Sequence, residues 1–273
     1  MAPRAKPLHV AELGRGRPLV LVHGWATSGR VLLELAGALS GVARVVLPDL
    51  RGHGSSPPPE GAFSIDDHGA DVAGLARELG GEPPLLAGWS LGALVALAAS
   101  ARLEAEGVAV AGLALLAPTA RFTSGEGHPH GLPPSEVEGL KARMRRNPAK
   151  ALARFFAACL AEGELPGAER ERALALLALE PPDAGGALAA LDALAAGDLR
   201  EVASRLRSPA LLLHGERDAI VPPGASEALA RTLPRARRRT FPGAGHAPFL
   251  SRPSEVAAAL REFAAAPADG VAD

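Results

Sequence analysis

The chain has 273 residues, of which 48% are hydrophobic and 22% are charged, and its formal net charge is −1. This composition excludes a disordered chain and a protein drawn to nucleic acid by its overall charge, so we expect no nucleic-acid partner. The single cysteine, Cys159, excludes an intramolecular disulfide, and no histidine joins it in a metal-ligand spacing.

The N-terminal residues and the hydropathy of the chain indicate the cellular compartment in which we expect the protein. Residues 1–10 contain Arg4 and Lys6 but no apolar core of signal-peptide length. No stretch of about 20 uncharged apolar residues occurs elsewhere. We therefore expect a cytoplasmic protein without a membrane partner, and one cysteine fits a reducing compartment. Residues 267–273 lack periodicity and are expected to fray.

Short apolar runs typical of β-strands recur along the chain, mostly separated by helix-like segments. They cover residues 18–22, 43–47, 84–87, 109–116, 209–213 and 237–241. Alternation of this kind predicts an α/β fold, with a mostly parallel central sheet covered by helices on both faces. Ser64 is expected to cap a helix over residues 65–79, and Pro253 to open a final helix that ends near Ala265.

Between Pro118 and about Arg200 the strand-like runs stop, and short helices are punctuated by proline and glycine. The chain is therefore predicted to divide into a core, residues 1–118 and 201–273, and a helical cap, residues 119–200.

Three signals predict helix boundaries inside this cap. Ser135 and Glu138 have the spacing of a capping box for a helix to about residue 146. Asn147 and Pro148 open a second helix, expected to end near residue 163, and Asp183 starts a later one after two prolines. The second helix has one apolar face at three-to-four spacing, formed by Ala151, Leu152, Phe155, Phe156, Cys159 and Leu160.

Gly88-Trp89-Ser90-Leu91-Gly92 reads G-x-S-x-G between a strand-like run and a helix-like run. A serine on a sharp turn needs glycines two residues to either side, so that strand and helix can approach without a side-chain clash. Ser90 is therefore a candidate nucleophile. The amide of Leu91, at the start of a helix, is a candidate oxyanion donor. The alternative is a glycine-rich loop with a chance serine.

A serine hydroxyl needs a base and a third group that orients the base. Asp218 lies just beyond a buried strand, and His246 lies in a glycine-rich loop after the last strand. The order Ser90, Asp218, His246 is the nucleophile, acid and base order of the α/β-hydrolases. Such a triad calls for no metal or organic cofactor. Three alternatives remain: Asp218 pairs with Arg217 or caps the helix near residue 223, Glu216 is the acid, or His246 is an ordinary loop histidine.

The loop after the first core strand, Val22-His23-Gly24-Trp25, is expected to supply the second oxyanion donor, the amide of Trp25. His23 is expected to brace this loop, and His53 lies on a turn that shapes the floor of the site. The Trp25 side chain either lines the acyl pocket or packs in the core.

Segments 21–25, 88–92 and 245–251 resemble the pimeloyl-acyl-carrier-protein methyl ester carboxylesterases, a biotin-synthesis family of α/β-hydrolases. Cap segments 154–159 and 197–200 are similar to that family too, and the likeness covers nearly the whole chain. The resemblance implies a serine carboxylesterase that releases methanol and a free carboxylate from pimeloyl-carrier protein, through an acyl-enzyme on Ser90. It implies substrate contacts by Trp25, Ser90, Leu91, Phe155, Phe156, Ala157, Ala158, Cys159 and His246.

Residues 141–154 include six basic side chains and no acidic one, although the whole protein is near neutral. They are Lys141, Arg143, Arg145, Arg146, Lys150 and Arg154. A cationic face on the cap is what docking of an acidic carrier protein requires, and Arg143, Arg146, Lys150 and Arg154 are the candidates. The alternative is a solvated helix face balanced by Glu136 and Glu138.

Because one fold and one triad serve several chemistries, other functions stay open. The first alternative is another activity on small acyl or carbonyl substrates: a general esterase acting on small esters, a carbon–carbon bond hydrolase or a quinone-pathway lyase. The second is a non-catalytic ligand receptor on the same scaffold.

Overall fold

The computed structural model describes residues 7–58 and 61–266, so the predicted frayed tail lies outside the described residues. Within them, seven strands form one sheet in the order β1-β3-β2-β4-β5-β6-β7. The strands are β1 (Val10–Leu13), β2 (Pro18–Val22), β3 (Arg44–Pro48), β4 (Leu85–Trp89), β5 (Gly112–Leu116), β6 (Ala210–Gly215) and β7 (Ala236–Phe241). Only β1 runs antiparallel to its neighbour among these strands. The predicted α/β fold with a mostly parallel sheet is confirmed.

The six predicted strands are all present, with ends that differ by a few residues. Strands β2, β4 and β5 are buried along their whole length, as their continuous apolar sequences require when helices cover both faces. Strand β1 was not predicted. It has four residues, none of them fully buried, and it pairs with β3 at the edge of the sheet.

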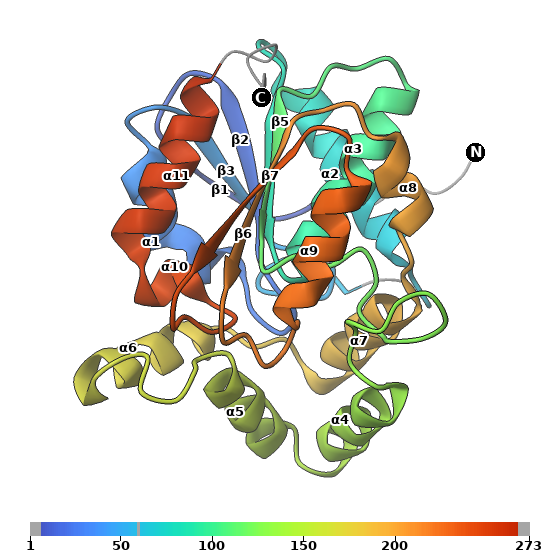
Figure 1. The fold of residues 1–273 in the computed structure, drawn as a ribbon, viewed down its shortest axis with the longest axis vertical. Coiled ribbons are helices and arrows are strands. Elements are labelled where there is room, and N and C mark those ends of the chain that lie inside the picture. The colour runs from blue at the N-terminus through green and yellow to red at the C-terminus, as the bar shows by residue number, and fades with distance from the viewer. Residues whose placement is uncertain (1–6, 59–60, 267–273) are drawn as a thin grey trace.

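Helices cover both faces of this sheet (Figure 1). Helices α1 (Leu33–Leu39) and α11 (Pro253–Ala265) lie on one face, and α2 (Ile65–Leu79), α3 (Leu91–Ala105) and α9 (Pro223–Thr232) on the other. Shorter helices are η1 (Gly29–Leu32), α8 (Arg200–Arg205) and α10 (Pro248–Ser251). The predicted cap of α2 is confirmed, because the Ser64 hydroxyl accepts the N–H of Asp67 while the Asp67 carboxylate accepts that of Ser64.

Four helices follow β5 in the chain, before α8 leads into β6: α4 (Pro134–Arg146), α5 (Pro148–Ala158), α6 (Gly167–Leu177) and α7 (Ala184–Ala196). Figure 1 shows them together at one end of the molecule, beyond the sheet. We propose that residues 119–200 act as a cap over a core formed by the rest of the chain. None of the helices within residues 7–58 and 61–266 combines the length and apolar character that a membrane span requires.

Two predicted boundaries in this region are wrong. Helix α4 starts at Pro134 with Pro133 as its N-cap, because proline already has a helical φ at the first position, so Ser135 lies inside the first turn and forms no capping box. Helix α5 starts as predicted, with the Asn147 side chain accepting the N–H of Lys150 at 3.0 Å. It ends at Ala158, because the next carbonyl, that of Cys159, binds amides of a core loop.

Candidate active site

Ser90 stands at the sharp turn between β4 and α3, with φ 57° and ψ −116°. A non-glycine residue in such a conformation costs about 1–3 kcal/mol and needs support from its surroundings. A Cβ on Gly88 would lie 2.0 Å from the carbonyl oxygen of Gly92, and a Cβ on Gly92 would lie 2.3 Å from that of Val22. The glycines therefore allow the close approach, and the Ser90 N–H donates to the Leu116 carbonyl at 2.9 Å, which anchors the turn to β5.

Asp218 follows β6 and His246 follows β7, so both lie at the same end of the parallel sheet as Ser90. Nδ1 of His246 is 2.8 Å from Oδ2 of Asp218, and both side chains are fully buried. Burial by itself opposes ionisation of Asp218, but His246 and His214 overcome it and hold the pKa of that carboxyl well below its usual range. Asp218 is therefore an ionised carboxylate that orients the His246 ring.

The structure does not support the alternatives to a contact between Asp218 and His246. Arg217 donates from its guanidinium to the carbonyl of Glu162 at 2.9 Å, and Glu216 accepts the N–H of Gly243 at 3.0 Å. The N-cap of α9 is Pro222. Of the nearby acids, Asp218 is the one in contact with His246.

The second nitrogen of His246, Nε2, is buried and has no hydrogen-bond partner among the described residues. The His246 carbonyl accepts the indole N–H of Trp89 at 2.8 Å, and the two rings lie 5.5 Å apart. Because Trp89 directly precedes Ser90, the imidazole lies beside the elbow. A buried ring nitrogen without a partner costs about 1–3 kcal/mol, and a catalytic role is one reason why a native structure keeps such a group.

Two buried imidazoles hold the loop after β2. His23 bonds through Nδ1 to the carbonyl of Gly24 at 2.8 Å and accepts the N–H of Leu50 at Nε2, 2.9 Å away. His53 accepts the N–H of Ala26 at Nε2, at 3.3 Å. Burial lowers the pKa of His23, and it lowers that of His53 to about 3. Both rings are therefore neutral, as accepting a backbone N–H requires.

The same loop carries a strained backbone, since Ala26 has φ 61°. Within the described residues, no hydrogen-bond acceptor pairs with the backbone N–H of Trp25 or with that of Leu91. Neither of the predicted oxyanion donors is therefore engaged by another group of the described residues. The predicted bracing by His23 matches its contacts, and His53 adds a second brace on the other side of Trp25.

The proposed cap contacts the core at Trp25 and at His246. The Trp25 indole N–H donates to the carbonyl of Ala187 at 2.7 Å, and its ring packs edge-on against Phe155 with centroids 4.7 Å apart. The carbonyl of Cys159 accepts the N–H of His246 at 2.8 Å. Burial raises the pKa of the Cys159 thiol well above its usual range, which makes it a packing group and a poor nucleophile.

An apolar pocket of about 320 Å³ lies between α4, α5 and the loop after β6. Its apolar lining includes Phe122, Leu132, Val137, Leu140, Phe155 and Ile220. Of the predicted substrate-contacting residues, Phe155 and Ala158 line it. The others do not: Trp25, Ser90, Leu91, Phe156, Ala157, Cys159 and His246.

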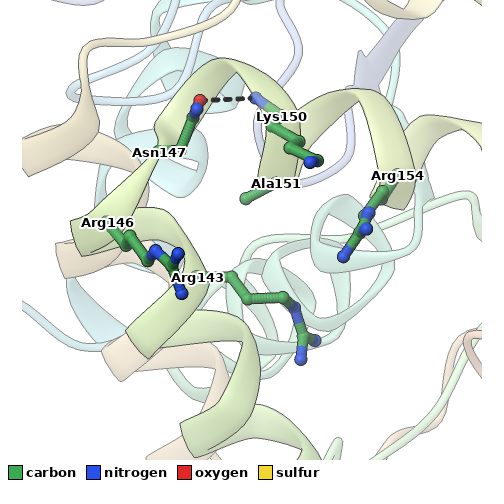
Figure 2. Close-up of a pocket in the computed structure, with 6 residues that line it drawn as sticks. All are labelled: Arg143, Arg146, Asn147, Lys150, Ala151 and Arg154. Atoms are coloured by element: carbon green, nitrogen blue, oxygen red, sulfur yellow. Dashed lines mark hydrogen bonds between the residues drawn. The ribbon is translucent and has the colours of Figure 1, made fainter.

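A second pocket, of about 280 Å³, lies between α4 and α5 and is lined by all four predicted docking residues: Arg143, Arg146, Lys150 and Arg154, with Asn147 and Ala151. Figure 2 shows the cations extending from the two helices around Ala151, with Asn147 where the helices join. Within the described residues, none of these four cations forms an ion pair. Lys141 differs from them, because it is buried and binds Glu138 and Asp192, so it does not belong to the exposed cationic stretch.

No role is predicted from the sequence for His214, which the structure brings to the same carboxylate. Its Nε2 lies 3.1 Å from Oδ2 of Asp218, and both side chains are fully buried. The signal that could have found it is its position at the end of a buried strand, four residues before the candidate acid.

Comparison with known proteins agrees with this fold. The sequence pattern of the alpha/beta hydrolase fold family matches residues 17–253. A pimeloyl-[acyl-carrier protein] methyl ester esterase from Stenotrophomonas maltophilia is 37% identical over 267 residues, which cover 96% of this chain and 99% of that protein. An esterase from Exiguobacterium antarcticum has a similar structure, with a TM-score of 0.85 and 23% identity over 94% of this chain and 95% of that one. A thermophilic esterase from Thermogutta terrifontis gives a TM-score of 0.78 and 31% identity, over 94% and 92%. The chain therefore belongs to the alpha/beta hydrolase fold family, and within it to the family of the pimeloyl-[acyl-carrier protein] methyl ester esterases.

Proposed function

We propose that this protein is a serine carboxylesterase that hydrolyses the methyl ester of pimeloyl-acyl-carrier protein to the free carboxylate and methanol. The observation that carries the proposal is the His246 ring, held at Nδ1 by the ionised Asp218 and left without a partner at Nε2, beside the Ser90 elbow. The names of the relatives supply the substrate.

In the first half of the reaction, Nε2 of His246 takes the proton of Ser90 as Oγ attacks the ester carbonyl. The N–H groups of Trp25 and Leu91 hold the developing oxyanion, and loss of one such donor typically costs about 10²–10³-fold in kcat. The bond to the methoxy oxygen then breaks, and His246 returns the proton to the departing methanol. In the second half, water attacks the acyl-enzyme, His246 takes its proton, and Ser90 regains it as the carboxylate leaves.

The shape of the substrate explains how the two pockets would be used. The methyl ester must reach Ser90 while the carrier protein, at the other end of the acyl chain, stays outside. The apolar pocket supplies a surface for the chain, and Arg143, Ala151 and Arg154 line both it and the cationic pocket. An acidic carrier at the cationic pocket would therefore dock directly beside the site that receives its acyl chain.

The direct test is hydrolysis of methyl pimeloyl-carrier protein. Incubation with the enzyme should convert the carrier-bound ester to a carrier-bound acid, seen by mass spectrometry of the intact carrier as loss of one methyl group in exchange for hydrogen. Free dimethyl pimelate is the comparison substrate, and the carrier-bound ester should give the higher kcat/KM. Equal kcat/KM values would favour a general esterase, and no product at high enzyme concentration would contradict the proposal.

Charge reversal tests the docking surface. The double variant Arg146→Glu and Lys150→Glu should lower kcat/KM for the carrier-bound ester about tenfold or more, because two attractive charges of roughly 0.5–1 kcal/mol each become repulsive. Hydrolysis of a free ester should be unchanged.

The matched control for this double variant is Arg145→Glu. Arg145 is exposed on the same helix, α4, but does not line the cationic pocket. Steady-state kinetics at two ionic strengths would separate the variants, since added salt should weaken carrier docking in the wild type more than in the double variant. An equal loss in the Arg145→Glu control would contradict docking at this pocket.

A further inference from the structure

We propose that His214 is a positioning residue of the catalytic triad, which acts by sharing the carboxylate of Asp218 with His246. The proposal rests on the proposed function, since it concerns the acid that orients the base. It would make the acidic member of this triad a carboxylate with two imidazole partners.

The contacts of His214 indicate which of its ring nitrogens carries a proton. Its Nε2 lies 2.9 Å from the carbonyl oxygen of Val221 and 3.1 Å from Oδ2 of Asp218. A carbonyl oxygen only accepts, so Nε2 carries the proton and donates. Its Nδ1 is buried and has no partner among the described residues, so a second proton there would be a buried charged donor without an acceptor, which favours the Nε2–H tautomer.

His214 completes a set of contacts around the acid. Oδ1 of Asp218 accepts the N–H groups of Ile220 and Val221, at 2.8 and 2.9 Å, while Oδ2 faces His246 and His214. Val221 is thus held at both ends, by Asp218 through its N–H and by His214 through its carbonyl. The ring fixes where Oδ2 lies, and the direction of the bond to His246 depends on that position.

Sharing Oδ2 also sets how strongly Asp218 attracts a proton to His246. The His214 N–H, which lies between the Val221 carbonyl and this oxygen, already offsets part of the negative charge before His246 becomes cationic. The titratable groups that face Asp218 are His214 from β6, His246 from the loop after β7 and the Cys159 thiol at the end of α5, with Glu164 beyond that thiol. Loss of the His214 donor should leave His246 facing a more basic oxygen, so that a proton is held more tightly at the base.

Two amide variants of His214 test whether its N–H toward Asp218 matters or only the packing of its ring. In His214→Gln the amide nitrogen reaches the position of Nε2, whereas in His214→Asn it reaches only that of Nδ1. On a short p-nitrophenyl ester, His214→Asn should lower kcat about tenfold, the low end of the 10–100-fold range found for groups that orient metal-binding side chains, with little change in KM. In the pH profile of kcat/KM, the acid limb of the His214→Asn variant, where activity falls at low pH, should move to higher pH. His214→Gln should recover most of kcat and the wild-type limb.

The outcomes distinguish this proposal from the proposed function. If the wild type does not turn over any ester, the proposed function fails. If the wild type is active and His214→Asn keeps its kcat and its acid limb, or if the Gln variant is as impaired as Asn, His214 does not position the triad. A measurement on the wild type covers the case in which a variant does not fold: ¹⁵N NMR should find His214 as the neutral Nε2–H tautomer throughout the pH range of the acid limb. An Nδ1–H or charged ring would overturn the proposal.

Discussion

Ser90→Ala should lower kcat for a short p-nitrophenyl ester by about 10⁶-fold, a loss comparable to removal of the nucleophile in another serine hydrolase. Without Oγ there is no acyl-enzyme, and water has to attack the ester with help only from the oxyanion donors and from binding. Within the described residues the Ser90 hydroxyl makes no side-chain hydrogen bond, so its removal breaks no contact of the fold. Circular dichroism should therefore show a melting temperature within about 2 °C of the wild type.

Ser100→Ala is the matched control for this change. Ser100 lies on α3, the helix that follows the elbow, and its hydroxyl is fully buried without a partner among the described residues. The same chemical change ten residues away should leave kcat within about twofold, as expected for a site with no contact to the chemistry. A Ser90→Ala protein that keeps the wild-type rate would overturn the acyl-enzyme mechanism. A wild type that binds ester without repeated turnover would favour the ligand receptor.

The elbow and the Asp218–His246 pair could be predicted because each depends on local sequence. Ser90 needs glycines at fixed spacing, and the atoms that Gly88 and Gly92 approach are backbone atoms of adjoining elements. Asp218 and His246 each follow a strand whose apolar sequence is evident, and parallel strands bring such ends to one edge of the sheet. Order and strand-end position predicted this pair, and the structure places the two side chains 2.8 Å apart.

The features that the sequence did not predict depend on contacts between distant segments or on weak local signals. Strand β1 has four partly exposed residues, too few for alternation to stand out, and pairing with β3 defines it. In the sequence Lys141 belongs to a basic stretch. In the fold α4 packs against α7, which brings Asp192 into an ion pair with Lys141. Pro133 and Ser135 compete to begin α4, and only the backbone conformation decides between them.

The position of His214 in the site is another feature that the sequence did not predict. In the sequence it is one histidine at the end of a run of leucines, and neither its neighbours nor its spacing requires a function. Its contact with Asp218 arises because the chain turns back after β6, so that residues 218–221 lie against the end of the strand. The two braces of the oxyanion loop likewise depend on distant segments, since His23 accepts the N–H of Leu50 and His53 accepts that of Ala26, each across 27 residues.

Asp218→Asn should lower kcat about 10⁴-fold, as the equivalent change does in other Ser-His-Asp enzymes. The pKa of Asp218 lies well below its usual range, so the wild-type carboxylate is ionised wherever the enzyme is assayed, and it accepts the Nδ1–H of His246. An amide can present its NH₂ group to that nitrogen instead. The ring then takes the other tautomer, with its proton on Nε2, and cannot remove the proton of Ser90.

The variant should also be less stable, in a pH-dependent way. Because the pKa of Asp218 is lowered in the folded protein, its ionised form stabilises the fold above the unfolded pKa of aspartate, about 4, and this contribution is lost as the pH falls through the folded pKa. Melting temperatures of the wild type and Asp218→Asn should therefore differ most at neutral pH and converge in acid. Constant separation down to low pH would mean that Asp218 does not carry this charge.

Glu216→Gln is the control that decides which acid serves His246. Glu216 lies two residues from Asp218 on the same loop and binds the N–H of Gly243, a contact that an amide oxygen can keep. Its variant should retain kcat within about threefold, since the lost charge acts on His246 only at a distance and partly through solvent. If Glu216→Gln lost activity and Asp218→Asn kept it, the base would be oriented by Glu216 in the working enzyme, and the role proposed for His214 would fail together with that of Asp218.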